Sequence, residues 1–563
     1  MTAVTAPATP TAPAATVRPD TSRTLRLGLL AGLGMVFVTA IGMLETFNGR
    51  TLIDPILSLG YLVLFMFPFL IGRLIGRRKA VEGIETAPRT SADIMAAALA
   101  GGLAGLVAGL FALLVDAAPG LRSTFPNLST SSVEVLTLGL GVGPGLLVLV
   151  AVSAVVAALG TSSFWLAPRV RRALSIALQT VVFVAIFEAV IDDFFDWLNA
   201  IPDFLYASGG GLTIVSAVVV FLVAGALAWF LPGRVPSVRN ALQVEDAGRR
   251  RRNSLIAAVV VFLVVLVVPQ FLGGVLNELL TNVGLFLLMG LGLNIVVGHA
   301  GLLDLGYVAF FAVGAYSTAV LTSPLSPFFN PELNWWQAFP IVLIVAAIAG
   351  IMVGTPVIRM RGDYLAIVTL GFGEIVRLLL LSDWLSPYFG GSQGIRRIPG
   401  IPVGGEIGGT DIHLFVYFTI ALVAVAAYVS WRLEDSRIGR AWAALREDED
   451  VAEAVGVDTV KAKLQAFVTG AILASFAGAL FAAKVGSVFT NSFEILVSIV
   501  ILVVVIVGGM GNIAGVAVGA LVLIGVLGGP NQPGLLQEFG EYKLLIYGAL
   551  LVFMMLQKPE GLL

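Results

Sequence analysis

Charged residues are scarce in this chain of 563 residues: they make up 12% of it, whereas hydrophobic residues make up 58%. An average soluble domain has about 25% charged residues. With so few charges and a mean hydropathy of +0.98, the chain has too little polar surface to coat a water-soluble particle of this size. The composition excludes disordered, collagen-like and coiled-coil proteins and predicts an all-α polytopic membrane protein.

Cysteine is absent, and there are only two histidines, His299 and His413. The absence of cysteine excludes disulfides, thiolate metal sites and a cysteine nucleophile. No Gly-Lys dipeptide occurs, so the chain contains no P-loop for ATP. We therefore expect no catalytic residue, metal or cofactor in this chain, and no nucleic-acid partner.

Long apolar runs are what the sequence does contain. About 20 such residues cross the hydrocarbon core of a bilayer. This length predicts about sixteen spans, or at least fourteen because some are short or interrupted by glycine. The predicted limits are 27–44, 52–72, 92–115, 139–166, 173–198, 212–231, 254–271, 275–297, 305–323, 337–358, 364–381, 413–431, 464–484, 494–508, 514–528 and 541–557.

The spans fall into two groups. A tail at 1–24, rich in Ala, Thr and Pro, is expected to be disordered and cytoplasmic, and six spans follow within 25–233. A basic stretch at 234–253, with four arginines at 249–252, is expected to be a cytoplasmic linker. The other ten spans lie within 254–563.

The basic residues predict the topology, because Lys and Arg in short loops stay in the cytoplasm. With both termini cytoplasmic, 26 of the 33 basic residues lie on that side. Those that do not are Arg50, Arg122, Arg377, Arg396, Arg397, Lys484 and Lys543.

Glu374 and Arg377 stand three residues apart on one face of the predicted span 364–381. Each charge costs about 2.5–3.5 kcal/mol at the centre of a span. The helix must therefore face protein or a wet cavity, and the pair is either structural or part of a transport path. The nearby Thr369–Gly373 segment imitates a potassium-channel filter, but it lies near a helix end with no separate pore helix.

Two glycine-rich connections are further candidates. Around His299, Gly301, Gly306 and Tyr307 the glycines predict a tight turn between spans, either a packed hairpin or part of an inner gate. The external loop at 382–411 contains GGSQGIRR. It is either solvated or faces the carboxylates of a partner. Its candidate residues are Gly391, Gly394, Arg396 and Arg397.

The segment 432–463 is the longest charged stretch of the second half and is predicted to be cytoplasmic. It combines an apolar edge at Trp442 and Leu445 with the sequence Glu453-Ala454-Val455-Gly456. A surface helix explains this pattern, and so does a helix and glycine loop that docks on an ATPase. In the second case Arg446, Glu453, Ala454 and Gly456 couple the two proteins.

Several ordered motifs in the second half resemble a known family. They are GLNIVVGHAGLLDLGYVAFFAVGAY, RMRGDYLAIVTLGFGEIVRLLL, GGSQGI, REDEDVAEAVGV, KLQAFVTGAILASFAGALFA and VVIVGGMGNIAGVAVGA. Together these stretches resemble the membrane permease subunits of bacterial branched-chain amino acid ABC importers. The resemblance covers about 254–563. Residues 1–253 lie outside it, and Asp304 stands where relatives often carry Ser.

The resemblance implies an inner-membrane permease working by alternating access with two cytoplasmic ABC ATPase subunits, a second permease subunit and an extracytoplasmic binding protein. ATP would be bound by the partner subunits. The substrate implied is a branched-chain, hydrophobic amino acid; a urea or short-chain amide importer is the alternative within the same family. A secondary transporter or channel would need no ATPase, and its segment 439–463 would be dispensable. A purely structural membrane scaffold would be unchanged by replacement of Glu374 or Arg377.

Overall fold

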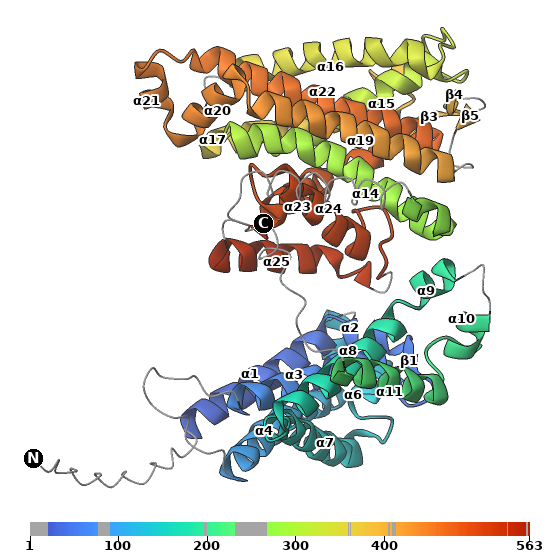
Figure 1. Cartoon of the computed structure of the whole chain (residues 1–563), viewed down its shortest axis with the longest axis vertical. Coiled ribbons are helices and arrows are strands. Elements are labelled where there is room, and N and C mark those ends of the chain that lie inside the picture. The colour runs from blue at the N-terminus through green and yellow to red at the C-terminus, as the bar shows by residue number, and fades with distance from the viewer. Residues whose placement is uncertain are drawn as a thin grey trace, which may run out of the picture. The chain divides into compact units, whose positions relative to one another are not determined.

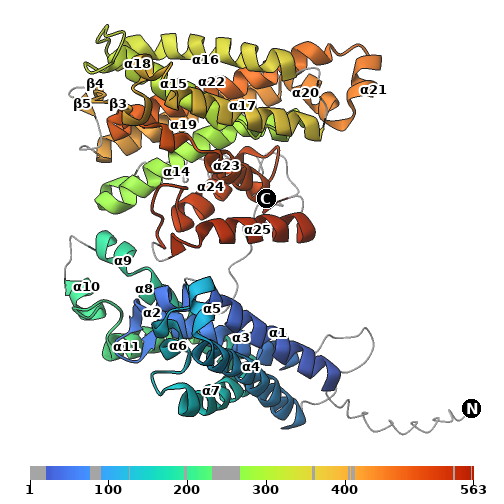
Figure 2. The ribbon, with the colours of Figure 1, turned by 180° about the vertical axis from the view of Figure 1, so that it is seen from behind.

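The computed structural model describes residues 21–76, 91–125, 127–195, 200–230, 267–357, 360, 362–402, 406–407, 412–536, 539–558 and 561–562. Helices dominate this part of the chain (Figures 1 and 2). The strands found within it form three short antiparallel pairs: β1 (Thr51–Ile53) with β2 (Leu57–Ser58), β3 (Ile395–Arg396) with β6 (Ser487–Val488), and β4 (Ile401–Pro402) with β5 (Glu406–Ile407). The predicted all-α class is confirmed.

The chain divides into two compact units. The first comprises Met1–Glu188 and Leu198–Val238, and the second comprises Ala189–Trp197 and Arg239–Leu563. The predicted linker at 234–253 lies outside the described residues, as does the predicted tail up to residue 20. The last four residues of that predicted tail belong to the first helix.

The first unit is built on long apolar helices that approach one another through small residues. Gly101, Gly105 and Gly109 face the next long helix, where an added Cβ would lie 2.3–2.8 Å from backbone or side-chain atoms. Such spacing lets helix backbones pack closely. The helices are α1 (Thr21–Ala40), α2 (Met43–Asn48), α3 (Leu59–Gly76), α4 (Ser91–Ala117), α5 (Pro119–Thr124), α6 (Thr130–Leu136), α7 (Val142–Ser162), α8 (Pro168–Ile186), α10 (Ala200–Leu205) and α11 (Ile214–Phe230). The helix between α8 and α10 is α9 (Glu188–Phe194), which belongs to the second unit from Ala189 on.

The second unit has its core around α14 (Gly274–Leu293) and α22 (Thr459–Val485), most of whose residues are buried. Gly314 and Gly478 let α22 approach α15, because a Cβ at either would lie about 2.1–2.2 Å from a facing carbonyl. The other helices are η2 (Asn294–His299), α15 (Val308–Thr322), α16 (Trp335–Val357), α17 (Asp363–Leu381), α18 (Ser386–Phe389), η3 (Gly391–Gln393), α19 (Ile412–Glu434), α20 (Arg437–Glu447), α21 (Glu449–Ala454), η4 (Thr490–Phe493), α23 (Ile495–Gly508), α24 (Ile513–Leu527) and α25 (Lys543–Gln557).

Ten helices in the described residues are long and apolar enough to cross a membrane, or eleven if the bent pair α8–α9 is one span. The bend between α8 and α9 is 76°. Four further apolar helices are shorter: α11, α15, α24 and α25. Most of the predicted span 254–271 lies outside the described residues. The chain is a multi-pass membrane protein, and the count of sixteen stays a prediction.

Candidate functional site: a cavity and a linked surface segment

The predicted coupling segment folds as two short helices, each with a side-chain cap. Ser436 accepts hydrogen bonds from the amides of Ile438 and Gly439 at the start of α20. Asp448 does the same for Asp450 and Val451 at the start of α21. Caps of this kind satisfy amides that the first turn leaves without partners. The sequence therefore breaks the charged stretch into two helices rather than one.

This pair of helices is fastened to the membrane-spanning core at one end of α22. The indole of Trp442 is buried and donates to the carbonyl of Ala462 at 2.9 Å. Lys463, whose side chain is 3% exposed, pairs with Glu449 at 2.7 Å. These contacts anchor α20 and α21 to the start of α22.

Arg446 provides a second connection, to the hairpin between α14 and α15. Its guanidinium donates to the carbonyl of Gly298 in the π-helix η2 at 2.5 Å. An added Cβ at Gly301, where φ is +71°, would lie 3.0 Å from the Arg446 side chain. π-Helical turns often occur at functional positions. Arg446, a predicted coupling residue, therefore contacts the hairpin that was predicted as a gate.

The rest of the hairpin is held by specific contacts to other helices. The Tyr307 hydroxyl donates to the carbonyl of Gly470 at 3.0 Å. Gly306 lies against α17, since its added Cβ would come within 1.9 Å of the Thr369 carbonyl. His299 ends η2, and within the described part of the chain its buried Nε2 atom has no hydrogen-bond partner. The structure thus brings the four predicted hairpin residues into one packed turn.

Asp304 is the hairpin's buried carboxyl, 2% exposed. Its Oδ1 atom accepts from the amide of Gly306 at 2.9 Å. Burial raises the pKa of the carboxyl to about 6, although that hydrogen bond opposes the shift. At neutral pH a negative charge therefore sits in the packed turn at a cost.

Glu374 and Arg377 bind each other on α17, with Arg377 Nη2 and Glu374 Oε1 2.5 Å apart. Both side chains are partly exposed, Arg377 at 22% and Glu374 at 37%. A role for this pair in the transport path stays a prediction. Thr369–Gly373 is part of the same regular helix and does not form a filter-like loop.

The predicted external loop is tied to the end of α22 opposite the coupling segment. Strand β3 pairs with β6, so that Ile395 faces Val488. Gly391 and Gly394 have φ values of +53° and +62°, which glycine adopts without strain. Arg396 stacks on Phe489 at 5.8 Å, and Arg397 is exposed. The described part of the loop, up to residue 402, is thus held against the end of α22. A contact between the loop and a partner stays a prediction.

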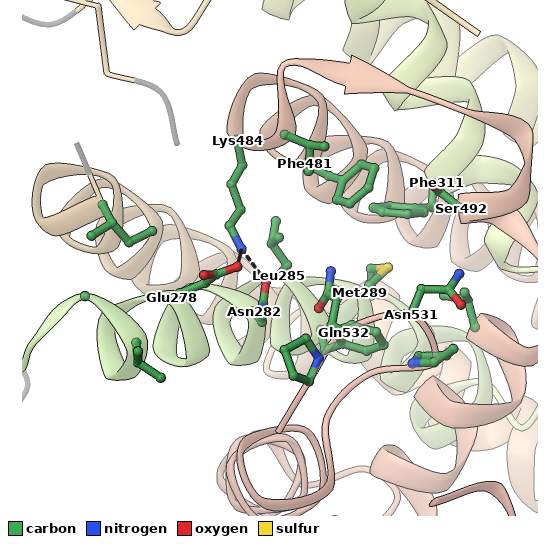
Figure 3. A pocket seen from close by; sticks show the side chains of 18 residues that line it. Glu278, Asn282, Leu285, Met289, Phe311, Phe481, Lys484, Ser492, Asn531 and Gln532 are labelled. Atoms are coloured by element: carbon green, nitrogen blue, oxygen red, sulfur yellow. Dashed lines mark hydrogen bonds and ion pairs between the residues drawn. The ribbon is translucent and has the colours of Figure 1, made fainter. Parts of the chain in front are cut away.

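A cavity of about 720 Å³ lies within the second unit, among α14, α22 and the loop between α24 and α25 (Figure 3). Such concave, mostly apolar spaces are typical of ligand sites. The cavity is lined by polar and apolar side chains, which include Glu278, Asn282, Leu285, Met289, Phe311, Phe481, Lys484, Ser492 and Gln532. None of the six predicted pathway residues is among the residues that line this cavity. Gly301 lines a smaller one, of about 170 Å³, beside Lys463 and Glu449.

The sequence analysis did not predict the polar residues of the cavity, although the position of Lys484 was unusual for a basic residue. It was one of the basic residues that the predicted topology placed away from the cytoplasm. Nothing in the sequence connected it to Asn282 or Glu278, about 200 residues earlier, which contact it at 2.5 and 3.8 Å.

The fold, the cavity and the relatives together define a membrane transport permease. The chain belongs to the family described as the permease component of branched-chain amino acid transport systems, whose model matches residues 275–555. The high-affinity branched-chain amino acid transport system permease proteins LivM of Salmonella typhimurium and Escherichia coli are each 40% identical to it over 308 residues. These alignments cover 51% of this chain and 69% of each relative.

More distant relatives are matched over nearly their whole length. A probable branched-chain amino acid transport permease protein LivM of Methanocaldococcus jannaschii is 27% identical, with 93% of it covered. The LivH permease protein of Salmonella typhimurium is 24% identical, with 91% covered. About half of this chain takes part in each case. No solved structure matches the chain.

Proposed function

We propose that this chain is the permease subunit of an ATP-driven importer of branched-chain amino acids. It works with two cytoplasmic ABC ATPases, a second permease subunit and an extracytoplasmic binding protein. The relatives named above support the substrate class. The chain itself hydrolyses no ATP, and the nucleotide is bound by the partner ATPases.

The observation that carries the coupling proposal is the link from α20 through Arg446 to Gly298. A movement of α20 and α21 caused by ATPase closure reaches the hairpin 294–308 directly. The same hairpin joins α14, which lines the cavity, and α15. Alternating access then needs only two arrangements whose balance the partners shift.

The test is transport by the reconstituted complex. Liposomes holding both permeases and the ATPases, supplied with binding protein, should take up leucine only when ATP is present on the ATPase side. Leucine, urea and a short-chain amide are compared in parallel. Uptake of urea or the amide in place of leucine would assign the alternative substrate class. Leucine uptake that continues without ATPase subunits would indicate a secondary transporter or channel.

Labelling in cells tests the proposed topology. In this topology the chain lies in the bacterial inner membrane, with both termini and the coupling segment in the cytoplasm. Because the native chain has no cysteine, Asp450→Cys and Ser392→Cys are unique labelling sites, both exposed. An impermeant maleimide added outside cells should label Ser392→Cys and not Asp450→Cys. The reverse pattern would invert the topology.

A further inference from the structure

Lys484 is a buried cation, and its ion pair with Glu278 is long at 3.8 Å. Its side chain is 9% exposed, and its ammonium donates to the neutral Asn282 amide oxygen at 2.5 Å. The Glu278 side chain is 60% exposed, so water weakens its attraction for the Lys484 ammonium. The dashed lines in Figure 3 mark both contacts. A lysine inside a membrane protein is costly, and such residues commonly mark a substrate path.

Lys543 is the other lysine that the predicted topology places away from the cytoplasm, and it provides a contrast. Lys543 donates to the carbonyl of Gly529 at 2.7 Å. It thereby holds the loop that carries Gln532, which Tyr547 also anchors through the carbonyl of Gly528 at 2.5 Å. Lys543 is explained by this structural role, whereas Lys484 points into the cavity.

Gln532 adds a second polar feature to the cavity. Its Oε1 atom is buried and has no hydrogen-bond partner among the residues that the structure describes, although the residue lines the space. Figure 3 places Gln532 across the cavity from Phe481 and Lys484. A buried acceptor left without a donor costs free energy, which a ligand's N–H group would recover.

Apolar side chains make up the remaining wall. Leu285 and Met289 come from α14, Phe311 from α15 and Phe481 from α22. The rings of Phe311 and Phe481 lie 5.3 Å apart. This wall suits a branched aliphatic group. The Lys484 ammonium, the Glu278 carboxylate and the Gln532 Oε1 atom suit a small ligand that carries a negative and a positive charge.

We propose that the cavity binds the transported amino acid as a zwitterion. The Lys484 ammonium holds the carboxylate, Glu278 and the Gln532 Oε1 atom accept from the ammonium group, and the Leu285, Met289, Phe311 and Phe481 wall takes the side chain. This assignment rests on the proposed function and adds the substrate contacts to it.

The site lies far from the coupling segment. Lys463 and Lys484 are 21 residues apart on α22, which is about 32 Å along a helix. That length matches the hydrocarbon core of a bilayer. The cavity therefore begins at the end of α22 remote from the ATPase docking segment, where the external loop also attaches.

A cysteine placed in the cavity reports binding on this chain alone. Ser492→Cys, on η4, lines the space and is the chain's single thiol. In the complete complex, leucine should slow maleimide labelling of this site. Adding Lys484→Met should raise the leucine concentration for half-protection by roughly 10- to 100-fold, as expected for a lost hydrogen bond to a charged group. Glu278→Gln, at a more exposed residue, should raise it less.

The control is Lys558→Met, just after α25, where the residue is exposed and lies outside both the coupling segment and the cavity lining; it should leave protection unchanged. The amine that lacks leucine's carboxylate, 3-methylbutylamine, should protect equally weakly with and without Lys484→Met. Unliganded labelling and co-purification with the ATPases check that each variant folds.

The outcomes separate this inference from the proposed function. If the complex imports leucine with ATP but Lys484→Met leaves leucine protection unchanged, the zwitterion site is wrong and the importer stands. Absence of leucine protection in the transporting Ser492→Cys complex would also overturn the site. A complex that imports no branched-chain amino acid would overturn both.

Discussion

At the scale of single residues, Arg446 joins two elements that the chain separates by nearly 150 positions. A hydrogen bond from a charged group contributes about 1.5–3 kcal/mol. Here it connects the surface helix α20 to a π-helical turn at the end of α14. Lysine at this position would keep the charge but lose the planar guanidinium that fits the turn.

We expect Arg446→Ala to uncouple ATP hydrolysis from transport. The ATPases should still bind, because the exposed tip of α21 is unchanged, but leucine moved per ATP hydrolysed should fall about tenfold, a change of about 1.4 kcal/mol. The measurement is paired uptake and phosphate release in liposomes. Arg440→Ala is the matched control, since Arg440 on the same helix donates to the nearby Asp435 carbonyl at 3.3 Å and not to the hairpin residues that the structure describes. Unchanged stoichiometry in Arg446→Ala would contradict the coupling route.

Asp304 predicts a pH dependence of stability. The folded protein keeps this proton up to about pH 6, whereas an unfolded aspartate with a pKa of 3.8 has released it. The free energy of unfolding therefore decreases as the pH rises between these two values, by at most about 3 kcal/mol. Asp304→Ser keeps an acceptor for the Gly306 amide and removes the charge.

We expect the melting temperature of Asp304→Ser, relative to the wild type, to increase from about pH 4 to about pH 7. Thermal unfolding of the detergent-solubilised chain at several pH values measures this difference. A difference in melting temperature that is the same at every pH reports the side-chain volume that the substitution removes. A difference that stays flat with pH would show that folding does not raise the pKa of the Asp304 carboxyl.

At the scale of elements, α21 and the turn after it form an apolar tip. Val451 is 58% exposed and Val455 is 73% exposed. Exposed apolar residues next to polar ones are typical of a docking contact. Gly456 follows with φ at +91°, so any side chain there is strained even though an added Cβ would meet nothing within 4 Å. Val455 is therefore the better position at which to test docking.

Val455→Glu should weaken co-purification of the ATPases, because a carboxylate would have to be buried in an apolar contact. Val455→Leu, at the same position, should retain it. Pull-down of the ATPases with the detergent-solubilised chain measures the effect. Equal recovery with both variants would place docking elsewhere on the chain.

At the scale of the whole molecule, the family match begins at residue 275 and the first compact unit lies before it. The cavity and the coupling segment belong entirely to the second unit. A chain beginning near Arg249 should insert, join the ATPases and transport leucine in liposomes. If this shortened chain assembles normally but moves no substrate, residues before it belong to the transport path; if it does not assemble, they are required for folding.

The amino-acid sequence by itself determined the class of protein, because scarce charge and long apolar runs leave a membrane as the suitable solvent. Its ordered motifs identified the family, and the hairpin and the charged segment were both found as candidates. Those features depend on residues close together in the chain, where spacing has a direct structural meaning.

Tertiary structure alone decided which of these candidates meet and where the cavity lies. Arg446 reaches Gly298, and Lys484 reaches Asn282, only after distant helices pack. Hydropathy reports whether a helix prefers lipid or protein, but it carries no information on which faces come together. Packing of small residues such as Gly314 against α22 sets those faces. For that reason the polar end of the cavity could not be read from the sequence.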